Sequence, residues 1–164
     1  MGAHDILGIL CSNQQVNADD TPSTNTIDLA QTVPKIGVGQ HSPFLCIRTA
    51  VAPTAGSGDT LAIEVQTDAD DSSGAPVGSW DIPVFSPLVG ASGAEIDQGD
   101  PRLATAGAWI WRAPLPMDLF QRHMRLMFRN STTVGLFTID AWLSDGPPSD
   151  FRGSQELFSN VGQP

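Results

Sequence analysis

The chain has 164 residues, a formal net charge of −10 and a single lysine, Lys35. This length suits one domain with a sizeable core. The acidity serves solubility and argues against nucleic acid as a partner, because phosphate binding needs clustered Lys and Arg. The 16 glycines and 13 prolines are typical of short strands joined by turns.

Residues 1–23 are expected to form an N-terminal arm and a loop. Four apolar side chains near the start are too hydrophobic to remain solvated: Ile6, Leu7, Ile9 and Leu10. Residues 4–11 are therefore either a short first strand or an arm that docks on a neighbouring subunit. The apolar run lacks a basic flank and is too short for a signal peptide or a membrane span. We expect synthesis in a cytoplasm and no membrane partner.

Residues 24–145 are expected to form an all-β domain. Apolar and polar residues alternate with a period of two, which marks half-buried strands, in the segments 24–29, 44–51, 61–66, 80–85, 109–115, 123–129 and 137–143. With residues 4–11 the count is about eight antiparallel strands, which predicts a jelly roll or β-sandwich. No segment has a helical period of useful length.

The clearest pattern lies between Arg122 and Asp145 and predicts a hairpin with its turn at residues 130–135. In the register we expect, three apolar pairs share one face: Phe128 with Phe137, Leu126 with Ile139, and Met124 with Ala141. On the other face Arg125 lies opposite Asp140, a cross-strand pair that contributes roughly 0.2–1 kcal/mol.

The outer face of this hairpin is a candidate contact surface. Arg122, Arg129 and Trp142 lie on it, and interfaces are enriched in Arg and Trp. The alternative is an ordinary solvated face with a stacked arginine.

Residues 146–164 are expected to form an extended C-terminal tail, because the alternation ends at Gly146-Pro147-Pro148. Three large apolar side chains favour docking of the tail on a neighbour over a solvated tail: Phe151, Leu157 and Phe158. Termini that are not tied down are otherwise often disordered. The expected architecture is a jelly roll or β-sandwich with extended N- and C-terminal arms.

No catalytic or metal-binding motif is recognisable, so we expect neither an enzyme nor a cofactor. His4, His41 and His123 lie in unrelated contexts, and nucleophile-elbow, P-loop and zinc-protease patterns are missing. Residues 68–74 superficially resemble a calcium loop. However, the glycine comes one place late and Ser79 stands where a bidentate glutamate is required, which favours a solvated turn.

Two further residue types leave alternatives open. Cys11 and Cys46 form no C-x-x-C motif, so no zinc or redox site is indicated, and a bridge between them stays open. Trp109 and Trp111 are predicted to share a strand face, which is the geometry of a sugar-stacking platform. The alternative is that the tryptophans are buried in a core or an interface, and we favour this alternative.

The order of several short motifs resembles the jelly-roll capsid cement (decoration) proteins of short-tailed bacteriophages. The resemblance covers roughly residues 12–145 and rests on Ser23-Thr24-Asn25-Thr26-Ile27-Asp28-Leu29, Gly37-Val38-Gly39, Leu115-Pro116, Arg125-Leu126, and Gly135 leading into Phe137-Thr138-Ile139. The chain departs from the pattern at Met124, where an aromatic residue is expected, and in the exit at residues 146–148.

This resemblance implies a non-enzymatic homo-oligomer that clamps capsomers on the outer surface of the capsid in the virion. Its partner would be a major capsid protein of the HK97-type fold. A trimer is favoured over a dimer, and the tail, the arm and the outer face of the hairpin are the candidate gripping elements. The alternative function is a carbohydrate-binding β-sandwich module of a phage structural protein.

Overall fold

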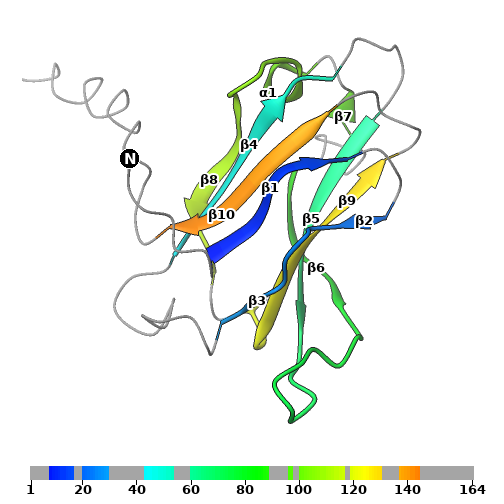
Figure 1. Ribbon diagram of the computed structural model, residues 1–164, viewed down its shortest axis with the longest axis vertical. Coiled ribbons are helices and arrows are strands. Elements are labelled where there is room, and N and C mark those ends of the chain that lie inside the picture. Colours follow the sequence, from blue (N-terminus) through cyan, green and yellow to red (C-terminus); the bar gives the residue numbers. More distant parts are fainter. Residues whose placement is uncertain are drawn as a thin grey trace, which may run out of the picture.

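The computed structural model describes residues 8–16, 20–29, 43–53, 60–88, 96–97, 100–116, 119–130 and 137–144. In this part of the chain, two antiparallel sheets lie face to face with the hydrophobic core between them (Figure 1). The all-β sandwich expected from the sequence is confirmed. No helix among the described residues is long and apolar enough to cross a membrane.

One sheet, here called sheet A, has four strands in the order β1-β10-β4-β8. Their bounds are Ile9–Gln15 for β1, Thr138–Ser144 for β10, Phe44–Val51 for β4 and Trp109–Pro114 for β8. The strand β1 lies within the segment that we assigned to an N-terminal arm, and its pairing with β10 places it in the sandwich. Residues 9–15 therefore form a first strand, which is one of the two structures expected for the N-terminal segment.

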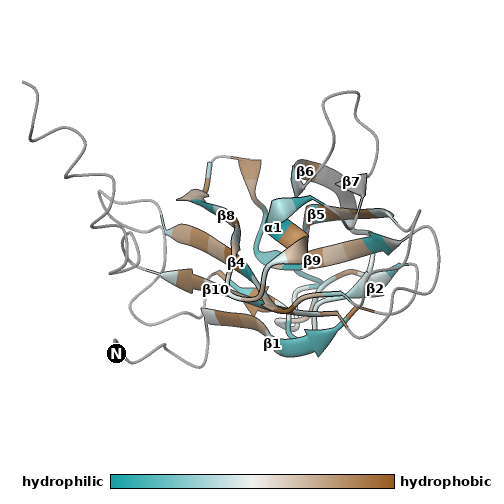
Figure 2. Cartoon of the chain, turned by 90° about the horizontal axis from the view of Figure 1, so that it is seen from above, coloured by the Kyte–Doolittle hydropathy of each residue, from teal (hydrophilic) through white to brown (hydrophobic). Residues whose placement is uncertain are grey.

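The second sheet, sheet B, has the order β2-β9-β5-β6, with β3 paired to β9 and β7 paired to β5. Its strands are β2 (Thr21–Pro22), β3 (Ile27–Asp28), β5 (Thr60–Asp68), β6 (Asp81–Leu88), β7 (Ile96–Asp97) and β9 (His123–Asn130). One short helix, α1 (Pro101–Ala104), is capped at its N-terminus by Asp100, whose carboxylate accepts a hydrogen bond from the backbone amide of Arg102. Figure 2 shows the strands of the two sheets on opposite sides of the core, with brown hydrophobic segments in the central strands.

The predicted hairpin is wrong, although both of its strands form. The strand β9 pairs with β5 in sheet B, whereas β10 pairs with β4 and β1 in sheet A. The six apolar residues of the hairpin face do lie together in the core: Phe128, Phe137, Leu126, Ile139, Met124 and Ala141. They meet across the sandwich instead of side by side, because alternation determines which face is buried and leaves the neighbouring strand undetermined.

The predicted pairing of Arg125 with Asp140 is wrong for the same reason. Arg125 donates to Gln66 in sheet B, at 2.9 Å between Nε and Oε1. Asp140 lies in sheet A and pairs with Arg48, at 2.8 Å between Nη2 and Oδ2. Arg125 and Asp140 therefore each bind a side chain on the neighbouring strand of their own sheet.

Both cysteines are buried and neither forms a disulfide, which answers the question of a bridge between them. Cys11 belongs to the core cluster, and its thiol lies 3.6 Å from the carbonyl oxygen of Ile139. Burial, reinforced by the charge of Asp140, raises the pKa of Cys11 to about 12. The thiol is therefore protonated at physiological pH and behaves as a small apolar side chain.

Candidate functional site

Two surface features of the described chain stand out, and the first is the loop between β5 and β6. We call residues 68–79 the acidic loop; it projects beyond one end of the sandwich (Figure 1). Its aspartates bind the backbone of their own turn. Asp68 accepts hydrogen bonds from the amides of Ala69 and Gly78, at 2.8 and 2.6 Å, and Asp70 accepts one from Gly74 at 3.0 Å.

Asp71 organises the tip of the acidic loop. Its Oδ1 accepts hydrogen bonds from the hydroxyl and the amide of Ser73, at 2.7 and 2.8 Å, and from the amide of Ala75 at 3.2 Å. The bonds from Ser73 hold the pKa of Asp71 below its usual value. Two backbone bonds close the turn, from Asp71 to the carbonyl of Ala75 and from Val77 to that of Ala69.

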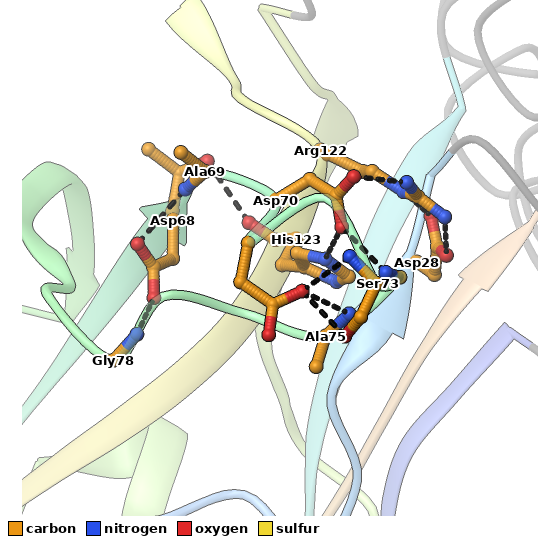
Figure 3. A network of polar contacts seen from close by, with 12 residues as sticks. Asp28, Asp68, Ala69, Asp70, Ser73, Ala75, Gly78, Arg122 and His123 are labelled. Atoms are coloured by element: carbon orange, nitrogen blue, oxygen red, sulfur yellow. Dashed lines mark hydrogen bonds and ion pairs between the residues drawn. The ribbon is translucent and has the colours of Figure 1, made fainter.

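Arg122 anchors the acidic loop to the sandwich (Figure 3). Its Nε and Nη2 bind the carboxylate of Asp28 on β3, at 3.0 and 2.9 Å, and its Nη1 binds Oδ2 of Asp70 at 2.6 Å. The bond to Asp28 raises the pKa of Arg122. One guanidinium therefore holds three segments that are distant in the sequence, and this charge is engaged within the chain.

His123 lies beneath the same network. Its side chain is buried, and its Nε2 lies 3.8 Å from Oδ1 of Asp70, too far for a hydrogen bond. Across the part of the chain that the structure describes, no three His, Cys, Asp or Glu side chains are placed to hold a metal ion. The loop carboxylates bind amides and Arg122 instead, which is the arrangement of a structural turn.

The outer face of sheet B also carries arginines that bind side chains of the same chain. Arg129, a predicted contact residue, binds Asp20 beside β2 and Glu64 on β5, the latter at 3.2 Å. The guanidinium carbon of Arg125 lies 4.1 Å from the ring centroid of Trp80, a cation–π contact. These interactions join β2, β9, β5 and the start of β6 on the side of the sheet that faces away from the core.

The second feature lies on the outer face of sheet A. We call Arg48, Trp109, Arg112 and Trp142 the tryptophan–arginine face. The two rings lie 5.7 Å apart between centroids at 54°. Arg48 covers the ring of Trp142 at 5.4 Å, and Arg112 covers the ring of Trp109 at 5.5 Å.

This arrangement corrects the predicted sugar platform. Trp111 packs against the core, whereas Trp109 contacts Trp142 on the outer face, so the two tryptophans of β8 do not share a face. The cause is an irregularity in the pairing of β4 with β8, where the register shifts between Ile47 and Arg48. Such an irregularity reverses the alternation and has no signal in the sequence.

Other predicted contact residues fall into three groups. Ile9 is half-buried in β1, and Leu10 is fully buried in the core of its own chain, so its side chain is not available to grip a neighbour. Five residues lie outside the described part of the chain, and their predicted contacts stay predictions: Ile6, Leu7, Phe151, Leu157 and Phe158. Trp142 is 8 % exposed, and its accessible surface belongs to the tryptophan–arginine face.

Comparison with known proteins gives one result. Residues 10–138 match the model of the Bbp16 family, so the chain belongs to this family. The name of the family suggests a bacteriophage protein. No curated protein matches the chain.

Proposed function

We propose that this member of the Bbp16 family is a capsid cement protein. It would bind the outer surface of a phage head and hold neighbouring capsomers of the major capsid protein together. The observation that carries the proposal is the family match over residues 10–138, which overlaps almost completely with the range of the cement-protein resemblance. The two-sheet sandwich is the architecture that this resemblance implies.

The arrangement of charges supports a mechanical role. Arg122 links β3 to the acidic loop, and Arg129 links β5 to the segment before β2, so ion pairs hold connecting segments against sheet B. Partly buried, multiply bonded arginines restrict motion more than isolated surface pairs do. A body of this kind can transmit force between the capsomers that it contacts.

Self-association belongs to the same proposal, with a trimer favoured over a dimer. The tryptophan–arginine face has the composition of interface hot spots, which are enriched in Trp and Arg. It is therefore our candidate for the contact between copies. Several modest contacts to the capsid, multiplied by the number of linked copies, would make dissociation slow.

The test is binding of the purified chain to phage heads that lack it. We expect co-sedimentation with the heads, saturation at a fixed number of copies, and a solution mass that is a multiple of 17.3 kDa. A strict monomer that does not bind the heads would contradict the proposal. An unrelated acidic protein is the control for non-specific trapping. It is incubated with heads that have been stripped of their cement protein and should not co-sediment with them.

A carbohydrate-binding module is the function from another class that the sequence left open. Its expected platform of Trp109 and Trp111 does not form, because Trp111 packs against the core. The Trp109–Trp142 pair is tilted, and Trp142 is largely covered, so the rings do not present one flat surface to a sugar. The tryptophans therefore do not form the platform that this function requires.

A further inference from the structure

The tryptophan–arginine face lies close to Ser144, after which the C-terminal tail of the chain begins. We propose that the tail of one copy, residues 145–164, docks on the tryptophan–arginine face of a neighbouring copy. This inference rests on the self-association in the proposed function, and it identifies the segment that covers the face.

The first observation is where the tail starts and how long it is. The strand β10 ends at Ser144, only two residues after Trp142, so each tail leaves the sandwich next to its own tryptophan–arginine face. Residues 145–164 lie outside the part of the chain that the structure describes. A fully extended chain spans about 3.3 Å per residue, so these residues can reach as far as roughly 65 Å. Copies that meet through this face therefore have each other's tails within reach.

The second observation is the charge of the face. Arg48 and Arg112 lie over the rings of Trp142 and Trp109, and Arg48 also binds Asp140. Two arginines and one aspartate give this group of side chains a charge of +1, whereas the whole chain has a net charge of −10. The side chain of Arg48 is 46 % exposed, so a further carboxylate can approach it. The face therefore favours an acidic partner.

The tail has the complementary composition. It carries three acidic residues and one arginine, which give it a charge of −2: Asp145, Asp150, Glu156 and Arg152. Its large apolar residues directly follow acidic ones, in Asp150-Phe151 and in Glu156-Leu157-Phe158. A carboxylate and an apolar side chain therefore reach the face together. The carboxylate binds an arginine, and the apolar side chain packs against the indole and guanidinium planes beside it.

A second tryptophan–arginine face is a less favourable occupant than the tail. Two identical faces in contact would bring the arginines of one copy against those of the other, and like charges across an interface are unfavourable. The tail brings opposite charges together instead. A ring in which each copy passes its tail to the next is a closed assembly, and the favoured trimer is such a ring.

The first test uses the fact that Lys35 is the only lysine of the chain. Arg112→Lys adds an amine to the tryptophan–arginine face and keeps its charge. A carbodiimide joins an amine to a carboxylate that lies against it. We expect mass spectrometry to find cross-linked peptides that join position 112 to Asp150 or Glu156.

Co-expression of two chains shows whether such a link joins two copies. One chain carries Arg112→Lys together with Asp150→Asn and Glu156→Gln, and the other is the wild type. An affinity tag on the first chain isolates the mixed oligomers. A link from position 112 to Asp150 or Glu156 then necessarily joins two copies. If the link forms with Arg112→Lys expressed alone but not in the mixed oligomers, the tail lies on the face of its own copy, and the inference is overturned.

The second test measures self-association by sedimentation equilibrium. Arg48→Glu reverses a charge of the face, and we expect it to weaken self-association roughly tenfold. Arg102→Glu is the matched control, because Arg102 is 40 % exposed, binds a single carboxylate and lies outside the face. It should associate like the wild type. Phe151→Ser changes only the tail, outside the sandwich, and should also weaken self-association.

The outcomes separate this inference from the cement function. A wild type that neither associates nor binds phage heads contradicts both. If the wild type binds heads but is monomeric, forms no link between copies, or associates as well as Arg48→Glu and Phe151→Ser do, tail docking is overturned and the cement function stands. Links between copies, with weaker association of Arg48→Glu and Phe151→Ser but not of Arg102→Glu, support the inference.

Discussion

At the scale of single residues, Arg122 links parts of the chain that are distant in the sequence. Its guanidinium binds Asp28 and Asp70, and these carboxylates belong to segments separated by 42 positions in the numbering, from residue 28 to residue 70. Neither partner was recognised from the sequence, since nothing in the spacing of residues 28, 70 and 122 signals that they meet. The expectation that Arg122 contacts a partner protein remains a prediction.

Replacement of Arg122 should therefore weaken the fold. We expect Arg122→Gln to lower the midpoint of thermal unfolding, because Asp28 and Asp70 lose a shared cation and are left close to each other. The matched variant is Arg48→Gln, whose side chain is 46 % exposed and binds a single carboxylate, so its effect should be smaller. Equal midpoints for Arg122→Gln and the wild type would contradict the anchoring role.

The buried thiols give a second prediction at this scale. Because burial raises the pKa of Cys11 to about 12, its thiolate is nearly absent at pH 8. We expect iodoacetamide to label neither Cys11 nor Cys46 in the native protein, and to label both in denaturant. Mass spectrometry measures the number of adducts, and rapid labelling of the native protein would show that this part of sheet A opens easily.

At the scale of elements, alternation in the sequence correctly indicated strands and their buried faces. It placed Phe128, Leu126 and Ile139 in the core, where the structure has them. It did not determine strand pairing, because a residue that faces inward satisfies the same pattern whether its neighbour lies beside it or across the core. The irregularity that places Trp109 and Trp111 on different faces was missed because it depends on the pairing of β8 with β4.

The strand pairing can be measured directly in solution. We expect backbone nuclear Overhauser effects between Ile63 and Phe128 across β5 and β9, and between Ile47 and Ala141 across β4 and β10. A hairpin would instead give strong backbone contacts between Phe128 and Phe137. Detection of that second set without the first would contradict the two-sheet topology.

The burial of the sandwich core leads to a prediction about stability. Phe128 is fully buried between the sheets, so Phe128→Ala should lower the free energy of unfolding by about 3–5 kcal/mol through lost burial and a cavity. Val51→Ala, at a position 45 % exposed, should change it by less than about 0.5 kcal/mol. Urea unfolding measures both values, and similar losses for the two variants would contradict the assigned core.

At the scale of the whole molecule, some charged side chains form ion pairs that stabilise the fold, and the excess of acidic residues sets the net charge. The chain carries 18 acidic and 8 basic residues, and Arg122 and Arg129 each bind two carboxylates of the same chain. This pairing holds the connecting segments in place and leaves an acidic molecule with a local tryptophan–arginine face. Composition alone indicated the acidity, but only the fold shows which charges meet.

The proposed cement function is tested most directly by density maps of phage heads with and without this chain. The difference between the maps should be a two-layer β-sandwich on the outer surface of the shell, in contact with more than one capsomer. A difference density inside the shell, at the tail, or missing altogether would contradict the proposed function.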